Sequence, residues 1–277
     1  MRWKSFDGLE IEGVLTRPPE WVARPPYELL LLHGGPHHRA TSGGGFDVQI
    51  FATCGFAVFQ PNFRGSTGYG LKFLDADGDD FGGGDMCDIF TGIDQLVQQG
   101  VVDSKRQSIY GVSYGGLLTS WLVGQTQQFR AAVAQNAVTD LNTMWHLSDL
   151  QSWTDWDMNG RPWEVPARLR EHSPLTHAHP ARDERPALSR GDGRHVPPCA
   201  ENGCPSQKAI EARTSVRYLK HRDASILNDT PCMFRDWRQR YILSERQVPI
   251  GRAIVCSRQR LKRTPSPNHA TAPLQVL

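Results

Sequence analysis

Long apolar runs and a surplus of one charge are both missing from this chain of 277 residues. No stretch approaches the length of a membrane span, and the N-terminus lacks the apolar run of a signal peptide. The formal net charge is only +2 at pH 7, which gives the molecule no electrostatic reason to bind nucleic acid or an anionic membrane. We therefore predict a cytoplasmic protein with no nucleic-acid partner and no membrane partner.

Sequence signatures of cofactors and structural metals are missing as well. The six cysteines form neither a dense disulfide framework nor a paired C-x-x-C metal site. The chain contains no P-loop and no G-x-G-x-x-G fingerprint. We therefore predict that the protein needs no cofactor.

The chain does contain alternating strand and helix patterns. Four short apolar runs predict strands buried on both faces: 28–32, 55–59, 108–112 and 131–134. Apolar residues recur at helical spacing over 86–97 and 117–122, and residues 6–15 predict an exposed antiparallel strand. This alternation indicates an α/β fold with a mostly parallel sheet, helices on both faces, and a ligand site at the carboxyl ends of the strands.

A G-x-S-x-G motif, Gly111 to Gly115, lies between a predicted strand and a predicted helix. A nucleophile elbow requires this context, because the glycines permit a strained turn that exposes the serine hydroxyl. Backbone N–H groups at the start of the helix then face the developing oxyanion. The alternative is a glycine-rich turn with an incidental serine, but the strand–turn–helix context favours Ser113 as a nucleophile.

The loop from His33 to His38 follows the first buried strand and contains two glycines. Hydrolases of this architecture take a second oxyanion donor from such a loop, where glycine lets the backbone approach the substrate oxygen. Its three histidines, which include His37, suggest a metal site as an alternative. No carboxylate or cysteine stands at ligand spacing, which favours histidines that orient the loop or face solvent. His33 is also an unsuitable base, because it precedes Ser113.

Four ordered motifs resemble the catalytic domain of the prolyl oligopeptidase family of serine peptidases. The motifs are HGGPH at 33–37, PNFRGSTGYG at 61–70, GVSYGG at 111–116 and SPL at 173–175. The likeness is greatest to the acylaminoacyl-peptidase and dipeptidyl-peptidase-like members, and it covers roughly residues 5 to 180. A combination of four ordered motifs is far more specific than the elbow alone. The resemblance implies an α/β-hydrolase fold.

The resemblance also implies roles for particular residues. Ser113 would be the nucleophile, and the backbone N–H groups of Tyr114 and Gly35 would form the oxyanion hole. Arg64 and Tyr69 would lie on the loop that borders the active site and would bind substrate. A loop anchored by its own hydrogen bonds is an equal alternative for these two residues.

The acid and the base of the catalytic triad depart from the family pattern. The family pattern places the acid where this chain has Gly193, so we assign Asp192, one residue earlier, by proximity. The expected Gly-His pair is missing, and His221 is assigned as the base because it is the histidine of the corresponding loop. An exposed histidine with no catalytic role is an equal alternative there. His195, beside the assigned acid, is a weaker candidate.

Composition changes again near the C-terminus. After about Arg246 the sequence becomes basic and rich in proline and serine, which is typical of a disordered tail that is solvated rather than bound to nucleic acid. We expect an α/β-hydrolase peptidase domain over 1–245, a degenerate acid and base region at 181–235, and a tail over 246–277. The C-terminal third should therefore be irregular.

The motifs predict a serine-type peptidase that hydrolyses short peptides through an acyl-enzyme on Ser113. Two alternatives stay open: a carboxylesterase-like hydrolase, and a catalytically impaired remnant of the fold. The sequence is compatible with a homo-oligomer. Family members usually carry an N-terminal β-propeller, and no propeller repeats precede the hydrolase module here, so a stand-alone enzyme and a fragment both fit.

Overall fold

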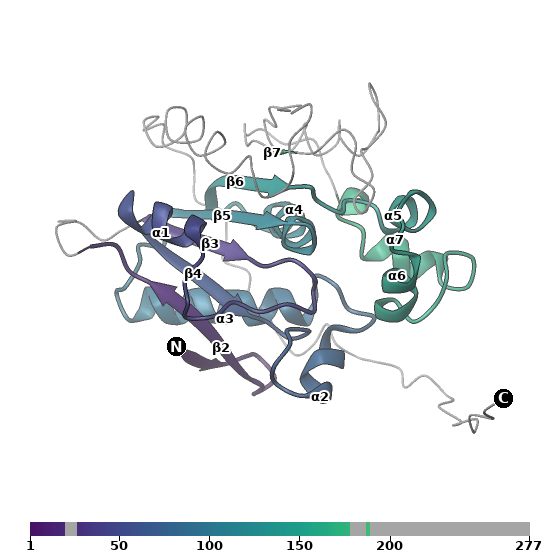
Figure 1. Cartoon of the computed structure of the whole chain (residues 1–277), viewed down its shortest axis with the longest axis horizontal. Coiled ribbons are helices and arrows are strands. Elements are labelled where there is room, and N and C mark those ends of the chain that lie inside the picture. The colour runs from purple at the N-terminus through teal and green to yellow at the C-terminus, as the bar shows by residue number, and fades with distance from the viewer. Residues whose placement is uncertain (20–26, 178–186, 189–277) are drawn as a thin grey trace.

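A mixed seven-stranded sheet is the centre of the part of the chain that the computed structural model describes, residues 1–19, 27–177 and 187–188 (Figure 1). In sheet order the strands are β1 (Arg2–Lys4), β2 (Glu10–Thr16), β4 (Phe56–Asn62), β3 (Tyr27–Leu32), β5 (Gln107–Val112), β6 (Phe129–Gln135) and β7 (Ala187–Leu188). Strand β2 pairs antiparallel with β1 and with β4, and the other described pairings are parallel. The predicted α/β fold with a mostly parallel sheet is confirmed.

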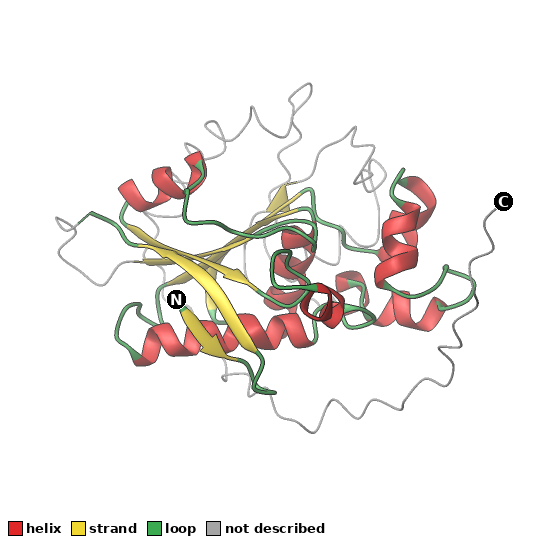
Figure 2. Cartoon of the chain, turned by 60° about the horizontal axis from the view of Figure 1, so that its bottom comes forward, coloured by secondary structure: helices red, strands yellow, loops and turns green. Residues whose placement is uncertain are grey.

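Helices cover both faces of this sheet, as Figure 2 shows. Helix α1 (Phe46–Thr53) packs on one face, in a cluster that contains Leu29 of β3. Helices α3 (Gly84–Gln98) and α4 (Tyr114–Gln125) pack on the other face, in a cluster that contains Leu30. Successive strand residues point to opposite faces, so an apolar run such as that of β3 supplies both layers of the core.

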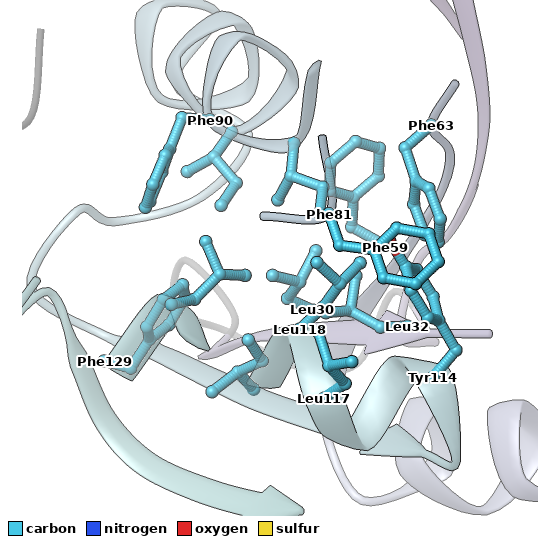
Figure 3. Packing of buried hydrophobic residues seen from close by; sticks show 14 of the residues in the cluster. Leu30, Leu32, Phe59, Phe63, Phe81, Phe90, Tyr114, Leu117, Leu118 and Phe129 are labelled. Carbon is cyan, nitrogen blue, oxygen red and sulfur yellow. The ribbon is translucent and has the colours of Figure 1, made fainter. Parts of the chain in front are cut away.

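The larger core layer extends from the sheet to the start of α4. Figure 3 shows Leu30, Leu32 and Phe59 of the strands packed with Leu117 and Leu118 of α4. The remaining helices are short: α2 (Leu71–Leu74), α5 (Leu141–Leu147), α6 (Gln151–Asp157) and α7 (Pro166–Glu171), with 3₁₀ turns at Asp75–Asp77 and Pro174–His177. Among the described residues, no helix is long and apolar enough to cross a bilayer.

The N-terminal hairpin differs in part from the prediction. Strand β2 is antiparallel, as expected, and it follows a turn in which the Gly8 N–H donates to the Ser5 carbonyl oxygen at 3.0 Å. The expected alternation is present, with the Glu10 and Glu12 side chains exposed and Ile11 buried, but β2 is not the edge strand of the sheet. The preceding residues form β1, which covers the outer edge of β2 and leaves it between two neighbours.

Two adjacent strands bring the predicted catalytic loops together. Strands β3 and β5 are parallel neighbours, and Leu32 pairs with Gly111 at their carboxyl ends. The His33–His38 loop and Ser113 therefore leave the sheet side by side, where parallel sheets bind ligands. Apart from β7, the predicted acid and base region lies outside the described residues, and so does the basic tail.

Candidate active site

Ser113 occupies a strained turn between β5 and α4. Its backbone has φ 60° and ψ −117°, a conformation that costs a non-glycine residue free energy and persists only where the surroundings impose it. The Ser113 N–H donates to the Gln135 carbonyl oxygen of β6 at 3.0 Å, and the Ser113 carbonyl accepts from Leu117 N–H at 2.9 Å. These bonds join the turn to the sheet on one side and to the helix on the other.

The two glycines of the motif are required by close backbone contacts. A Cβ atom on Gly115 would lie 2.2 Å from the carbonyl oxygen of Leu32, and one on Gly111 would lie 2.1 Å from the carbonyl oxygen of Gly115. Real Cβ atoms do not approach backbone oxygens this closely, so both positions exclude a side chain. The sequence motif and the geometry agree on a nucleophile elbow.

The elbow contacts the loop that was predicted to supply the second oxyanion donor. A Cβ atom on Gly34 would lie only 3.4 Å from Cβ of Ser113 and 4.0 Å from its Oγ. Gly35 follows with φ 119°, which requires glycine. Tyr114 is the first residue of α4, where a backbone N–H has no partner within the helix. The backbone at Gly35 and Tyr114 therefore lies on the two elements that meet at Ser113, which supports the predicted oxyanion hole.

The side chain of Tyr114 holds the start of α4 in the core. Its hydroxyl donates to Oδ2 of Asp85 at 2.7 Å, and its ring lies edge-on to Phe81 at 4.7 Å. Burial raises the pKa of Asp85 to about 7, although the hydrogen bond from Tyr114 opposes that shift. Asp85 thus positions the helix that follows Ser113.

His33 is a neutral, half-buried histidine that supports the loop. Burial lowers its pKa to about 4, and its ring stacks on Phe63 with centroids 4.3 Å apart. Nδ1 lies 2.9 Å from the Gly34 carbonyl oxygen, which makes Nδ1 the donor, and Nε2 lies 3.0 Å from Oγ of Ser66. Both ring nitrogens are occupied away from Ser113, in agreement with the conclusion that His33 is not its base.

Arg64 is directed into the protein interior. Its guanidinium donates to Asp88 from Nε at 2.9 Å and from NH2 at 2.7 Å, and a third donor reaches Asp7 at 3.2 Å. The Arg64 side chain is only 8% exposed, and the Asp88 side chain is fully buried. These contacts match the alternative that the sequence left open, a loop anchored by its own hydrogen bonds.

Tyr69 borders the same loop and is half-buried. Its hydroxyl accepts from Nδ2 of Asn62 at 2.8 Å, and its ring packs on Phe73 at 4.8 Å. Burial raises the pKa of Tyr69 above its ordinary value. A substrate contact of Tyr69 stays a prediction, as does one of Arg64.

The structure brings together Ser113, the predicted nucleophile, and both predicted oxyanion residues. The predicted acid Asp192, the predicted base His221 and the weaker candidate His195 lie outside the described residues. Within the described ranges, no group of three or more histidine, cysteine or acidic side chains is arranged to hold a metal ion. The supporting acids Asp85 and Asp88 were missed at the sequence level, although they stand in a stretch unusually rich in glycine and aspartate, 75–88.

Comparisons with known proteins agree with this geometry. The family model described as the prolyl oligopeptidase family matches residues 44–190. An uncharacterized peptidase of Bacillus subtilis, YuxL, is 36% identical over 191 residues, which are 68% of this chain and 29% of that protein. Dipeptidyl-peptidase 5 of Porphyromonas gingivalis is 29% identical over 168 residues, which are 59% of this chain and 25% of that protein.

Solved structures show the same fold. An acylaminoacyl peptidase of Pyrococcus horikoshii superposes with a TM-score of 0.78 at 24% identity, covering 87% of this chain and 41% of that one. Another acylaminoacyl peptidase, in complex with a Z-Gly-Gly-Phe chloromethyl ketone, has a TM-score of 0.79 at 23% identity and covers 90% of this chain and 42% of that one. The chain therefore spans less than half the length of the relatives and structures that it matches.

Proposed function

Because the chain belongs to the prolyl oligopeptidase family, we propose that it is a serine peptidase that hydrolyses short peptides through an acyl-enzyme on Ser113. The observation that carries the proposal is the strained elbow at Ser113 packed against the Gly34–Gly35 loop. This arrangement places a serine hydroxyl beside backbone groups that suit a developing oxyanion. In the proposal, the substrates are peptides of the cytoplasm, and the enzyme acts as a monomer or as a homo-oligomer.

In the proposed reaction, Oγ of Ser113 attacks the carbonyl carbon of the scissile peptide bond. A histidine accepts the hydroxyl proton, and the carbonyl oxygen takes the negative charge of the tetrahedral intermediate beside the N–H groups of Gly35 and Tyr114. The carbon–nitrogen bond then breaks, the amine leaves with the proton, and water hydrolyses the acyl-serine. We assign the base to His221 and the acid that orients it to Asp192, with His195 as the alternative base.

The carboxylesterase-like alternative uses the same elbow, because esters and amides pass through the same kind of intermediate. An enzyme that holds the leaving amine and protonates it hydrolyses peptides as well as esters. Comparing kcat/KM for a p-nitrophenyl ester and for the corresponding p-nitroanilide of one acyl group separates the two functions. Hydrolysis of the ester alone would favour the esterase.

Covalent labelling with a fluorophosphonate probe tests the nucleophile and the base together. We expect labelling of the folded wild type, loss of labelling in Ser113→Ala and His221→Ala, and full labelling in the control Ser104→Ala, whose serine is exposed in a turn away from the elbow. Loss in His195→Ala with retention in His221→Ala would move the base to His195. A folded wild-type chain that takes no label would reject the proposal and would favour a catalytically impaired remnant.

A further inference from the structure

His37 lies at the far end of the glycine loop from His33 and makes contacts of a different kind. Its Nδ1 is 3.0 Å from the carbonyl oxygen of Gly65, and its Nε2 is 2.8 Å from Oδ1 of Asp157, the last residue of α6. The first contact joins the loop to the 62–70 segment, and the second joins it to a helix 120 residues away in sequence. Three segments therefore meet at one imidazole ring.

Both neighbours of the ring can only accept a hydrogen bond. A backbone carbonyl and a carboxylate have no proton to give, whereas a neutral imidazole carries a single N–H. Only the imidazolium, with two N–H groups, satisfies Gly65 and Asp157 at the same time. The hydrogen bond that His37 donates to the Asp157 carboxylate raises the pKa of His37 to about 9, against an opposing effect of burial.

The charge near His37 has a single main source. Asp157 is buried, with its side chain 2% exposed. Asp77 is the second carboxylate that faces the ring. Burial raises the pKa of Asp77 to about 8, and the negative charges of Asp157 and Asp85 raise it in the same direction. These effects favour the neutral form of Asp77, and the carboxylate that contacts the imidazole ring directly is that of Asp157, at 2.8 Å.

The position of His37 is coupled to the oxyanion loop by the tightness of the turn. A Cβ atom on Gly35 would lie 2.4 Å from the backbone nitrogen of His37, and the His38 N–H donates to the Pro36 carbonyl at 2.7 Å. A shift of His37 must therefore move Gly35, and with it the Gly34 backbone that lies against Ser113. Oxyanion stabilisation depends on such donors being held within a few tenths of an ångström.

We propose that His37 is a positioning residue of the active site: its imidazolium, held between Gly65 and Asp157, fixes the Gly34–Gly35 backbone beside Ser113. The proposal rests on the proposed function, because the effect of a well-placed Gly34–Gly35 backbone is a faster attack of Ser113 on the substrate carbonyl. We call these two contacts of His37 the His37 clamp. Its loss displaces the Gly34–Gly35 loop but leaves the elbow at Ser113 intact.

The test uses Asp157→Asn, which keeps the shape of the helix end and removes its charge. In this variant His37 returns toward the ordinary histidine pKa near 6.5, so at pH 8 its ring is neutral with one N–H. The contact with residue 157 then has no ionic attraction and is at most a hydrogen bond between two uncharged groups, which is the weaker kind. We expect fluorophosphonate labelling at pH 8 to slow by roughly 10- to 100-fold, less than the ~10²–10³-fold loss for deletion of an oxyanion donor. The alkaline limb of the rate profile should move from about pH 9 down by about two pH units.

The matched control is His38→Gln, which changes an exposed histidine on the same loop. We expect its labelling rate and its pH profile to equal those of the wild type. An Asp157→Asn protein with the wild-type alkaline limb would overturn the proposal, because a purely structural contact would slow labelling without moving that limb.

A second measurement does not depend on activity. In a protein with ¹⁵N-labelled histidine and glycine, NMR should show both ring nitrogens of His37 protonated at pH 8 and single, sharp amide signals for Gly34 and Gly35. In Asp157→Asn the ring should be neutral and the two amide signals should broaden or double. A neutral His37 in the wild type, or unchanged glycine signals in the variant, would overturn the proposal. If the wild type takes no label but its NMR signals behave as expected, the peptidase function is rejected, whereas the positioning of the Gly34–Gly35 backbone by His37 is supported.

Discussion

Glu28 on β3 is a buried acid whose ionisation should lower the free energy of unfolding, and the substitution Glu28→Gln measures this effect. The side chain is fully buried, and its Oε2 accepts a hydrogen bond from Nε2 of Gln107 at 2.6 Å. Within the described residues, the other oxygen of each side chain, Oε1 of Glu28 and Oε1 of Gln107, has no hydrogen-bond partner. A protonated carboxyl group supplies the missing donor, because a carboxylic acid and an amide can form two hydrogen bonds to each other.

Burial raises the pKa of Glu28 from 4.5 to about 8, and the hydrogen bond from Gln107 opposes this shift. A group whose pKa is raised on folding contributes stability that is fully present below its unfolded pKa and is lost as pH rises through the folded pKa. At ~1.4 kcal/mol per pH unit, the charged form costs on the order of 4 kcal/mol by pH 9. Glutamine keeps the shape and both hydrogen bonds but cannot ionise.

The assay is urea unfolding of the full chain at pH 5 and at pH 9. We expect Glu28→Gln to change the free energy of unfolding little at pH 5 and to raise it by roughly 3–5 kcal/mol relative to the wild type at pH 9. The exposed control Glu171→Gln should stay within about 0.5 kcal/mol of the wild type at both pH values. Equal wild-type and Glu28→Gln stabilities at both pH values would refute the assignment of a neutral Glu28.

Two further substitutions test the supports of the active site. Gly115→Ala places a methyl group 2.2 Å from a backbone oxygen, so it should lower the free energy of unfolding by about 1–3 kcal/mol and slow fluorophosphonate labelling at least ~100-fold. The control Gly43→Ala, whose Cβ atom would meet only Thr41 Oγ1 at an ordinary 3.8 Å, should change neither. Arg64→Met leaves buried Asp88 without its ion-pair partner and should cost about 3–5 kcal/mol in urea unfolding. Arg64→Met combined with Asp88→Asn should recover most of that loss, and equal stability of the single and double variants would show that an unpaired charge is not its cause.

The parts of the fold that could be predicted from sequence are those that local patterns determine. The four apolar runs became β3 to β6 because a strand buried on both faces needs consecutive apolar residues. Ser113 was identified because its strain, its glycines and its position between strand and helix are all local. The hairpin partner of β2 could not be predicted, because three residues, Arg2–Lys4, carry too short a pattern.

The role of Arg64 and the clamp at His37 depend on contacts between distant residues. Arg64 meets Asp88 across 24 positions, and His37 meets Asp157 across 120. A motif shows that an arginine or a histidine is present, but burial and the partner decide its charge and direction. This is why His33 and His37, four residues apart in one motif, have pKa values on opposite sides of the ordinary histidine value.

The glycine- and aspartate-rich stretch 75–88 supplies carboxylates that contact the 62–70 loop and the start of α4. Asp88 fixes the guanidinium of Arg64, and Asp85 fixes the hydroxyl of Tyr114. Asp77 lies so close to Gly65 that a Cβ atom on Gly65 would be 2.2 Å from the Asp77 carboxylate, and the carbonyl of the same glycine accepts a hydrogen bond from His37. Glycines at 82–84 allow the chain to turn tightly enough for these acids to reach the 62–70 loop and the elbow. Asp85 and Asp88 therefore act by holding other side chains of the protein near Ser113, so their substitution should alter labelling and stability together.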